Sequence, residues 1–290
     1  MKKVLNVFLF VYICLFSVTA LSSCSYSKGD LIGTTTEVLD TEETYKTCGT
    51  CNDTVKWKYD ASTSTFCYFG TGKITNSDGI VESEWSNWAK IAETFKLEEG
   101  ITDVDKYVFE NFQSAKYIYL PSSYEGYVPE IKNIEKFIVA ENNPKYSSDE
   151  NGVLFNNDKT EIIRYPKCST LELYEIPKGV TSICSGAFDE TGNLKTVIMP
   201  DTLKNLHSHI FDESSLYLNS ENWEDDVFYV GNSLIKVDSE TEAEHIVVRE
   251  GTEIIASDAF IHCQNIKSIT IPASVKTIGN SVFVGCYSLE

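Results

Sequence analysis

One phrase recurs along this chain at a fixed spacing of 23 residues, the interval that separates Phe188 from Phe211. The same interval separates equivalent residues elsewhere: Pro177 and Pro200, Phe260 and Phe283, Cys263 and Cys286. A period in the twenties that carries a strand and its return is typical of a stacked solenoid, in which no single unit can bury its own apolar face. The sequence therefore predicts a β-rich solenoid of repeats of about 23 residues, with short parallel strands.

Three complete phrases define the repeat, at residues 97–121, 176–200 and 248–272. Each phrase has a glycine before a short apolar strand, then a buried phenylalanine, and then an apolar segment that ends at a proline. Alternation in that last segment sends every second side chain to the outer face of the stack. We place the repeat array at 91–290.

Two insertions interrupt the array, near 144–166 and at 227–238. The first has an Asn-Asn-Asp turn between two apolar runs, and the second turns around Gly231 and Asn232, so both are expected to be β-hairpins that project from the edge of the solenoid. The chain stops at Glu290, where the next strand should begin. We expect either a longer array or a last unit that packs against something else.

Residues 48–90 are expected to form a small antiparallel hairpin module ahead of the repeats. Val55, Trp57 and Tyr59 alternate on one face of a first strand, and an Asp-Ala-Ser-Thr turn leads to a return strand. Trp85 and Trp88 follow, and we expect them to cover the first repeat as a cap, since the end of a solenoid must be shielded from water.

These patterns resemble one family, the BspA-type leucine-rich-repeat surface proteins. The resemblance rests on Gly-Val-Thr-Ser-Ile at 179–183, Ala-Phe at 187–188 and Asn-Leu-Lys-x-Val-x-x-Pro at 193–200. The hairpin sequence at 51–74 and the inserted unit at 141–166 are similar to segments of the same family. The resemblance implies an exported array of short parallel strands used for attachment to proteins and glycans of host or neighbouring cells. The segment 207–210, before Phe211, departs from the family's small residues.

The N-terminus predicts export. Residues 1–23 have two lysines, an apolar run from Val4 to Val18 and then small residues, which is typical of a signal peptide and too short for a permanent membrane span. Cleavage after Ala20 would release a secreted protein. The run 21–24 instead resembles a lipobox, in which Cys24 would receive lipid, and we favour this reading. Residues 24–47 are expected to be a flexible tether.

Charge and cysteine content narrow the partners. Asp and Glu number 43 against 24 Lys and Arg, a net charge of −19, which repels nucleic acid and anionic membranes. We therefore expect membrane association only through the lipid. Cys263 and Cys286 are expected to be buried free thiols. For the Cys-x-x-Cys pair we favour a structural disulfide from Cys48 or Cys51 to Cys67, since a zinc site needs two further ligands.

Nothing in the sequence predicts catalysis. The four histidines lie in no recognised catalytic spacing, and no phosphate-binding glycine loop, nucleophile elbow or calcium loop is present. We therefore expect a protein that is not an enzyme and that uses no cofactor or metal.

The candidate binding residues lie on the exposed strand positions of the three phrases. We expect the lysines to align in one column beside aromatic residues, forming a docking strip in an otherwise acidic chain. The candidates are Lys116, Tyr117, Tyr119, Lys195, Ile198, Lys267 and Thr270.

The sequence as a whole favours an exported, lipid-anchored protein that binds extracellular proteins or glycans at the cell surface. Many weak contacts over a rigid face would be multiplied by the display of many copies. Two alternatives remain open: a non-catalytic repeat module of a larger exported enzyme, and a structural spacer of the cell envelope.

Overall fold

The computed structural model describes residues 48–75 and 85–290. The expected signal peptide, tether and lipid-bearing Cys24 lie outside these residues. Within the described part, no helix has the length and apolar character needed to cross a membrane.

Most repeat units contribute one short strand to each of two sets of parallel strands, which we call the first and second ladders. The strands of the first ladder are β5 (Thr94–Leu97), β7 (Tyr117–Leu120), β8 (Lys136–Val139), β12 (Leu173–Glu175), β14 (Thr196–Ile198), β19 (His245–Val247) and β21 (Ser268–Thr270). The strands of the second ladder, which follow the repeat glycines or their equivalents, are β6 (Ile101–Val104), β13 (Ser182–Ile183), β15 (Asn205–Leu206), β20 (Ile254–Ile255) and β22 (Thr277–Ile278). The pairs β5-β7, β7-β8, β12-β14, β19-β21, β13-β15 and β20-β22 are parallel. Neither ladder is continuous, because β8 and β12, like β15 and β20, belong to different sheets. The predicted β-solenoid is confirmed.

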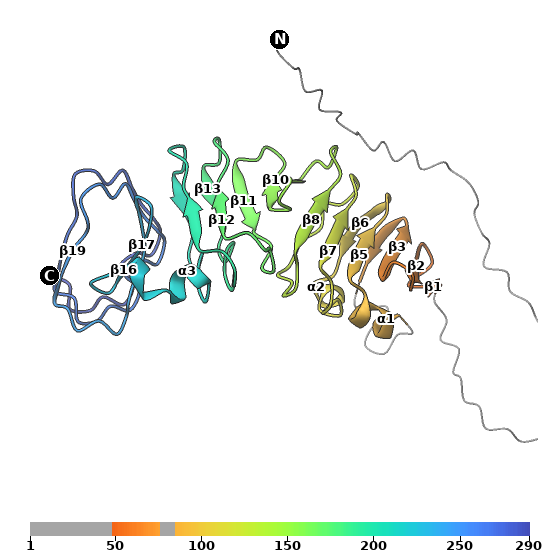
Figure 1. Ribbon diagram of the computed structural model, residues 1–290, viewed down its shortest axis with the longest axis horizontal. Helices are drawn as coiled ribbons and strands as arrows, with labels where there is room; N and C mark the ends of the chain where they lie inside the picture. The colour runs from red at the N-terminus through yellow and green to blue at the C-terminus, as the bar shows by residue number, and fades with distance from the viewer. Residues whose placement is uncertain (1–47, 76–84) are drawn as a thin grey trace, which may run out of the picture. The chain divides into compact units, whose positions relative to one another are not determined.

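The N-terminal hairpin is continuous with the solenoid. The strands β1 (Cys48–Thr50), β2 (Val55–Asp60) and β3 (Thr65–Gly70) pair antiparallel, and β3 then pairs in parallel with β5. The result is one six-stranded sheet in the order β1-β2-β3-β5-β7-β8, which we call the first sheet; β3, β5, β7 and β8 lie side by side in Figure 1. A further strand, β4 (Gly72–Ile74), pairs with β6 and starts the second ladder.

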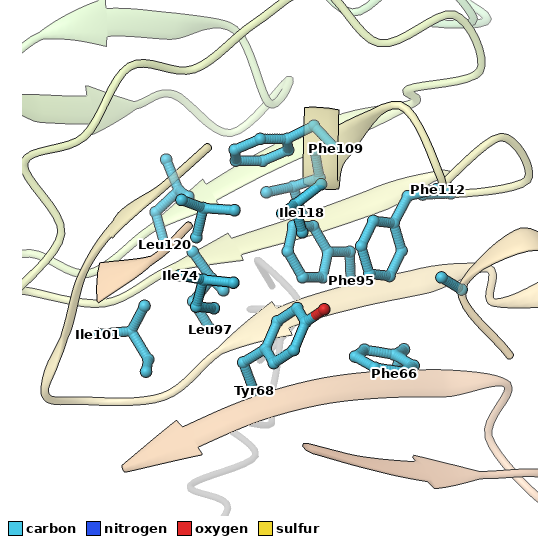
Figure 2. Packing of buried hydrophobic residues seen from close by; sticks show 14 of the residues in the cluster. Phe66, Tyr68, Ile74, Phe95, Leu97, Ile101, Phe109, Phe112, Ile118 and Leu120 are labelled. Carbon is cyan, nitrogen blue, oxygen red and sulfur yellow. The ribbon is translucent and has the colours of Figure 1, made fainter. Parts of the chain in front are cut away.

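Aromatic rings fill the core beneath the first sheet. The rings of Phe95 and Phe112 stack with centroids 3.8 Å apart, and Figure 2 shows Phe109 beside them with Ile118 and Leu120. Trp85 is buried and stacks on Phe112, as expected for a residue that covers the first repeat. The short helices α1 (Ser86–Ile91) and α2 (Lys106–Phe109) connect strands of this region.

The first insertion does not project from the edge, contrary to expectation. The strands β9 (Tyr146–Ser148), β10 (Leu154–Asn156) and β11 (Glu161–Arg164) form antiparallel pairs, and β11 then pairs in parallel with β13. Leu154 packs into the core beneath the first sheet, whereas Phe155 and Ile162 pack into a second core. The hairpin is therefore an internal layer with both faces buried.

The second insertion has the same arrangement. The strands β16 (Trp223–Glu224), β17 (Val227–Val230) and β18 (Ser233–Val237) follow α3 (Ser215–Leu218) and the 3-10 helix η3 (Ser220–Asn222), and β18 pairs in parallel with β20. Phe228 and Val230 face the second core, while Tyr229 and Leu234 face a third. The two hairpins thus divide the array into three blocks, each with its own core. Strands with apolar side chains on both faces cannot project into water, because exposing them would forfeit their burial.

A left-handed residue lies two positions before and two positions after the repeat phenylalanine in four units, at Phe188, Phe211, Phe260 and Phe283. The pairs, with φ between 52° and 82°, are Gly186 and Glu190, His209 and Glu213, Asp258 and His262, and Ser281 and Gly285. Left-handed backbone favours glycine, so a larger residue there is strained. His209 occupies the turn position that Gly186, Asp258 and Ser281 occupy in the other units. The irregular phrase before Phe211 therefore keeps the backbone turn of the repeat with a larger side chain.

Candidate functional site

The outward side of the first sheet has a composition unlike that of the chain as a whole. The outward positions of β2, β3, β5, β7 and β8 include four lysines and one acidic residue, Asp60, although acidic residues far outnumber basic ones overall. We call this surface the basic–aromatic face and define it by Lys56, Lys58, Phe69, Lys96, Tyr117, Tyr119, Lys136 and Ile138.

Strand register places its central residues in one row across the sheet. Lys58 is the partner of Cys67, which is the partner of Lys96; Tyr119 and Ile138 continue the row on β7 and β8. Strands in a sheet lie about 4.8 Å apart, so adjacent members of the row are close enough to contact one ligand together.

Glu98 organises the charges at one end of this row. Its Oε1 lies 3.4 Å from Lys58 Nζ and 3.8 Å from Lys96 Nζ, and it accepts a hydrogen bond from the thiol of Cys67 at 3.4 Å. Lys58 Nζ also lies over the ring of Phe69, 5.2 Å from its centroid. The two ammonium groups are therefore held at fixed places, although both side chains remain about half exposed.

The tyrosines supply the apolar part of the face. Tyr119 is 39% exposed and lies, with Ile138 and Pro121, in an open hollow of about 450 Å³ at the ends of β5, β7 and β8. The hydroxyl of Tyr117 donates a hydrogen bond to Glu135 Oε2 at 3.0 Å, and this bond raises the pKa of Tyr117. The face thus combines fixed cations, exposed rings and a hollow.

The expected column of lysines does not form. Lys116, Lys195 and Lys267 lie at equivalent positions, but the inserted hairpins leave them beside three different sheets. Each of the three forms an ion pair with a glutamate of the preceding unit: Lys116 with Glu93 at 3.2 Å, Lys195 with Glu172 at 2.7 Å, and Lys267 with Glu244 at 2.6 Å. Each of these lysines therefore has a glutamate, and not another lysine, as its neighbour in the preceding unit.

The other candidates are divided in the same way. Tyr117 and Tyr119 belong to the first sheet, whereas Ile198 and Thr270 are exposed on the sheets β12-β14 and β19-β21. The expected exposure of Tyr119, Ile198 and Thr270 is correct, but the structure does not bring these residues together.

The expected disulfide to Cys67 is also absent. Cys67 is a thiol, and Lys58 stands between it and Cys48 because β2 separates β1 from β3. Two strand spacings amount to roughly 9.6 Å, beyond the roughly 7 Å that a disulfide can bridge between Cα atoms. Burial, followed by the nearby carboxylate of Glu98, raises the pKa of Cys67 to about 12.

The structure also bears on the two cysteines of the third block and on the expectation that no metal is bound. Cys263 and Cys286 are free thiols, as expected; Cys263 is buried, but Cys286 is only partly buried, contrary to expectation. Burial raises the pKa of Cys263 to about 12. Within residues 48–75 and 85–290, no group of three or more His, Cys, Asp or Glu is arranged to hold a metal ion.

Sequence reasoning missed six members of the basic–aromatic face: Lys56, Lys58, Phe69, Lys96, Lys136 and Ile138. The alternation in β2 and β3 marks Lys58 and Phe69 as outward-facing once the inward residues are assigned. The pairing of β3 with β5 carried no local signal, because it joins segments that are distant in sequence.

Comparison with known proteins identifies the class to which this fold and repeat pattern belong. The model of the BspA type leucine rich repeat region matches residues 72–146 and 163–290 in six copies. The chain therefore belongs to the BspA-type leucine-rich-repeat family. No curated protein matches it.

Several solved structures are similar to the chain. A leucine-rich repeat protein from Eubacterium ventriosum is 18% identical, with a TM-score of 0.36 over 83% of this chain and 76% of that one. A leucine rich cell surface protein from Faecalibacterium prausnitzii is 16% identical, with a TM-score of 0.30 over 82% and 92%. The pneumococcal vaccine antigen PcpA is 17% identical, with a TM-score of 0.36 over 68% of this chain and 55% of that antigen.

Proposed function

We propose that this protein is exported, is anchored to the cell surface by lipid on Cys24, and binds an extracellular protein or glycan through the basic–aromatic face. One observation carries the proposal: lysines and tyrosines concentrate on one six-stranded sheet of a chain whose net charge is −19. Membership of the BspA-type family supports it, as does the N-terminal sequence.

The physical basis is the combination of rigidity and contact chemistry. Tyrosine offers a large contact area at a low cost in conformational entropy, and aromatic residues are enriched at interfaces. Lysines held beside Glu98 lose little further freedom when a ligand binds. The lysines of this face attract acidic groups of a partner more strongly than the acidic remainder of the surface does.

The lipid and the tether would add avidity. A chain of about two dozen residues between Cys24 and the folded body lets the face reach partners, and many anchored copies convert weak contacts into stable attachment. Replacing Cys24 by Ser would remove the proposed lipid attachment site. The variant should be released from the cell but should still bind, which would separate anchoring from binding.

The test compares two matched double variants in pull-downs from matrix and cell-surface extracts. Lys96→Ser with Tyr119→Ser alters the basic–aromatic face, and Lys195→Ser with Ile198→Ser alters an exposed lysine and an exposed apolar residue at a different sheet. We expect the first pair to lower ligand capture by about tenfold or more and the second pair to leave it unchanged. Equal capture by both variants, or no enrichment by the wild-type protein, contradicts the proposal and favours a spacer.

A further inference from the structure

A second hollow lies where the second block meets the third. The strand β15 is the last strand of the second block's sheet, and β20 lies between β18 and β22 in the sheet of the third block. The backbone N–H of Ser257 donates to the carbonyl oxygen of Leu206 at 2.9 Å, which ties the two blocks together. Between β15 on one side and β20 and β22 on the other, a pocket of about 280 Å³ remains, which we call the junction pocket.

The junction pocket is lined by both polar and apolar residues. Its polar side chains are two amides, two hydroxyls and one imidazole, contributed by Asn205, His207, Ser257, Thr277 and Asn280. Its apolar residues are Leu206 and Ile255, both buried, and Ile278, which is 46% exposed. This arrangement offers hydrogen-bond donors and acceptors beside an exposed hydrocarbon surface.

The lining of the pocket contains no Asp, Glu, Lys or Arg, although charged residues make up 23% of the chain. The adjacent Lys276 and Glu253 form an ion pair at 2.8 Å and so offset each other. A phosphate or carboxylate would find no lysine or arginine here, and a cation would find no carboxylate. The pocket therefore suits a neutral polar ligand.

Contacts between successive units hold the lining residues Ser257, Gly279 and Asn280 in place. The Oγ of Ser257 accepts a hydrogen bond from the backbone N–H of Asn280 at 3.1 Å. Gly279 packs so closely that a Cβ atom there would lie 2.4 Å from the nitrogen of Ser257. A site whose polar groups are fixed in advance loses less entropy when a ligand binds.

We propose that the junction pocket binds one residue of a neutral saccharide. Sugar hydroxyls can both donate to and accept from the amides of Asn205 and Asn280, and the C–H face of a sugar ring can pack on Ile278. The proposal is independent of the basic–aromatic face, because the pocket lies in a different part of the array and differs in chemistry.

The experiment uses the full chain labelled with ¹⁵N and titrated with single sugars. The neutral probes are methyl α-mannoside, methyl β-galactoside and methyl N-acetyl-β-glucosaminide, and glucuronate is the anionic comparison. We expect at least one neutral probe to shift the amide resonances of Gly279 and Asn280 with millimolar saturation, and glucuronate to bind about tenfold more weakly.

Two variants locate the binding. Asn205→Ala with Asn280→Ala should weaken the neutral sugar by about tenfold, whereas Asn142→Ala, at an exposed asparagine elsewhere, should not. Absence of saturable shifts with all three neutral probes overturns the proposal even if a variant fails to fold. Binding of glucuronate as tight as that of the neutral sugars, or binding that survives in a folded double variant, also overturns it.

Discussion

Phe188 and Phe211 stack in the second block with ring centroids 5.2 Å apart and ring planes inclined by 27°. They occupy the same position in consecutive units, and both are almost completely buried. Neither ring can be covered by its own unit, so each repeat depends on its neighbour for burial. This relationship contributes to the stability of the array.

Replacing Phe211 by Ala should lower the free energy of unfolding by about 3–4 kcal/mol, because it leaves a cavity against Phe188. The matched change Phe283→Ala should cost clearly less, since Phe283 is 38% exposed. Urea denaturation followed by tryptophan fluorescence measures both. Equal losses for the two variants would contradict a stack in which burial by the next unit sets the cost.

The left-handed turn positions predict opposite effects from reciprocal changes. Ser281 has φ of 56°, so Ser281→Gly should stabilise the protein by about 1 kcal/mol through relief of backbone strain. Gly186 has φ of 64°, and Gly186→Ser should destabilise it by a similar amount. Thermal melts of the two variants provide the check, and changes of the same sign would count against this account.

Lys167 is nearly buried among three carboxylates, with its Nζ 3.5 Å from Asp189 Oδ1 and 3.1 Å from Glu190 Oε2, and Glu130 as the third partner. Burial opposes its charge, but hydrogen bonds to Glu130 and Glu190 outweigh this and raise the pKa of Lys167. Lys167→Met should destabilise the protein by about 2–3 kcal/mol at pH 7, because it leaves carboxylates unpaired. A neutral effect in denaturant titrations would show that the cluster is solvated.

Asp189 in the same cluster predicts a pH dependence. Burial raises its pKa despite the nearby Lys167 and Arg164, so its contribution to stability is present at low pH and is lost as pH rises through the raised pKa. Asp189→Asn cannot ionise, so its stability relative to the wild type should increase between pH 3 and pH 7. Unfolding free energies measured at both pH values test the sign, and a relative decrease with pH would contradict it.

The thiol of Cys67 should be almost inert in the folded protein. With a pKa of about 12, only about one thiol in ten thousand is ionised at pH 8, and the side chain is buried. Peptide mass spectrometry after iodoacetamide treatment should show slow labelling of Cys67 in the native protein and rapid labelling in urea. A Cys67 disulfide in the unreduced protein would instead restore the expectation from sequence.

The repeat itself was predictable because its signal is local and periodic. Glycine, phenylalanine and proline at fixed intervals define the strands, and the alternation within each strand predicts that Ile118 is buried and Tyr119 exposed. Such patterns lie within one unit, so they can be recognised in the sequence without knowing which units are its neighbours.

The placement of the insertions and of the binding face was not predictable in the same way. The apolar run at 227–230 is compatible with either a projecting hairpin or a layer between two cores, and only the packing of Phe228 and Tyr229 into different cores decides between them. That layer also separates Lys195 from Lys267. The expected column failed because equivalent positions in sequence do not remain neighbours across an inserted layer.

The central claim, that the basic–aromatic face is the binding surface, is tested most directly by photo-crosslinking from single positions. A photoreactive phenylalanine analogue placed at Tyr119 should form adducts with the extracellular partner on illumination, whereas the same analogue at Ile198 should form few or none. Adducts of equal yield from both positions, or adducts from Ile198 alone, would contradict the assignment of binding to the first sheet.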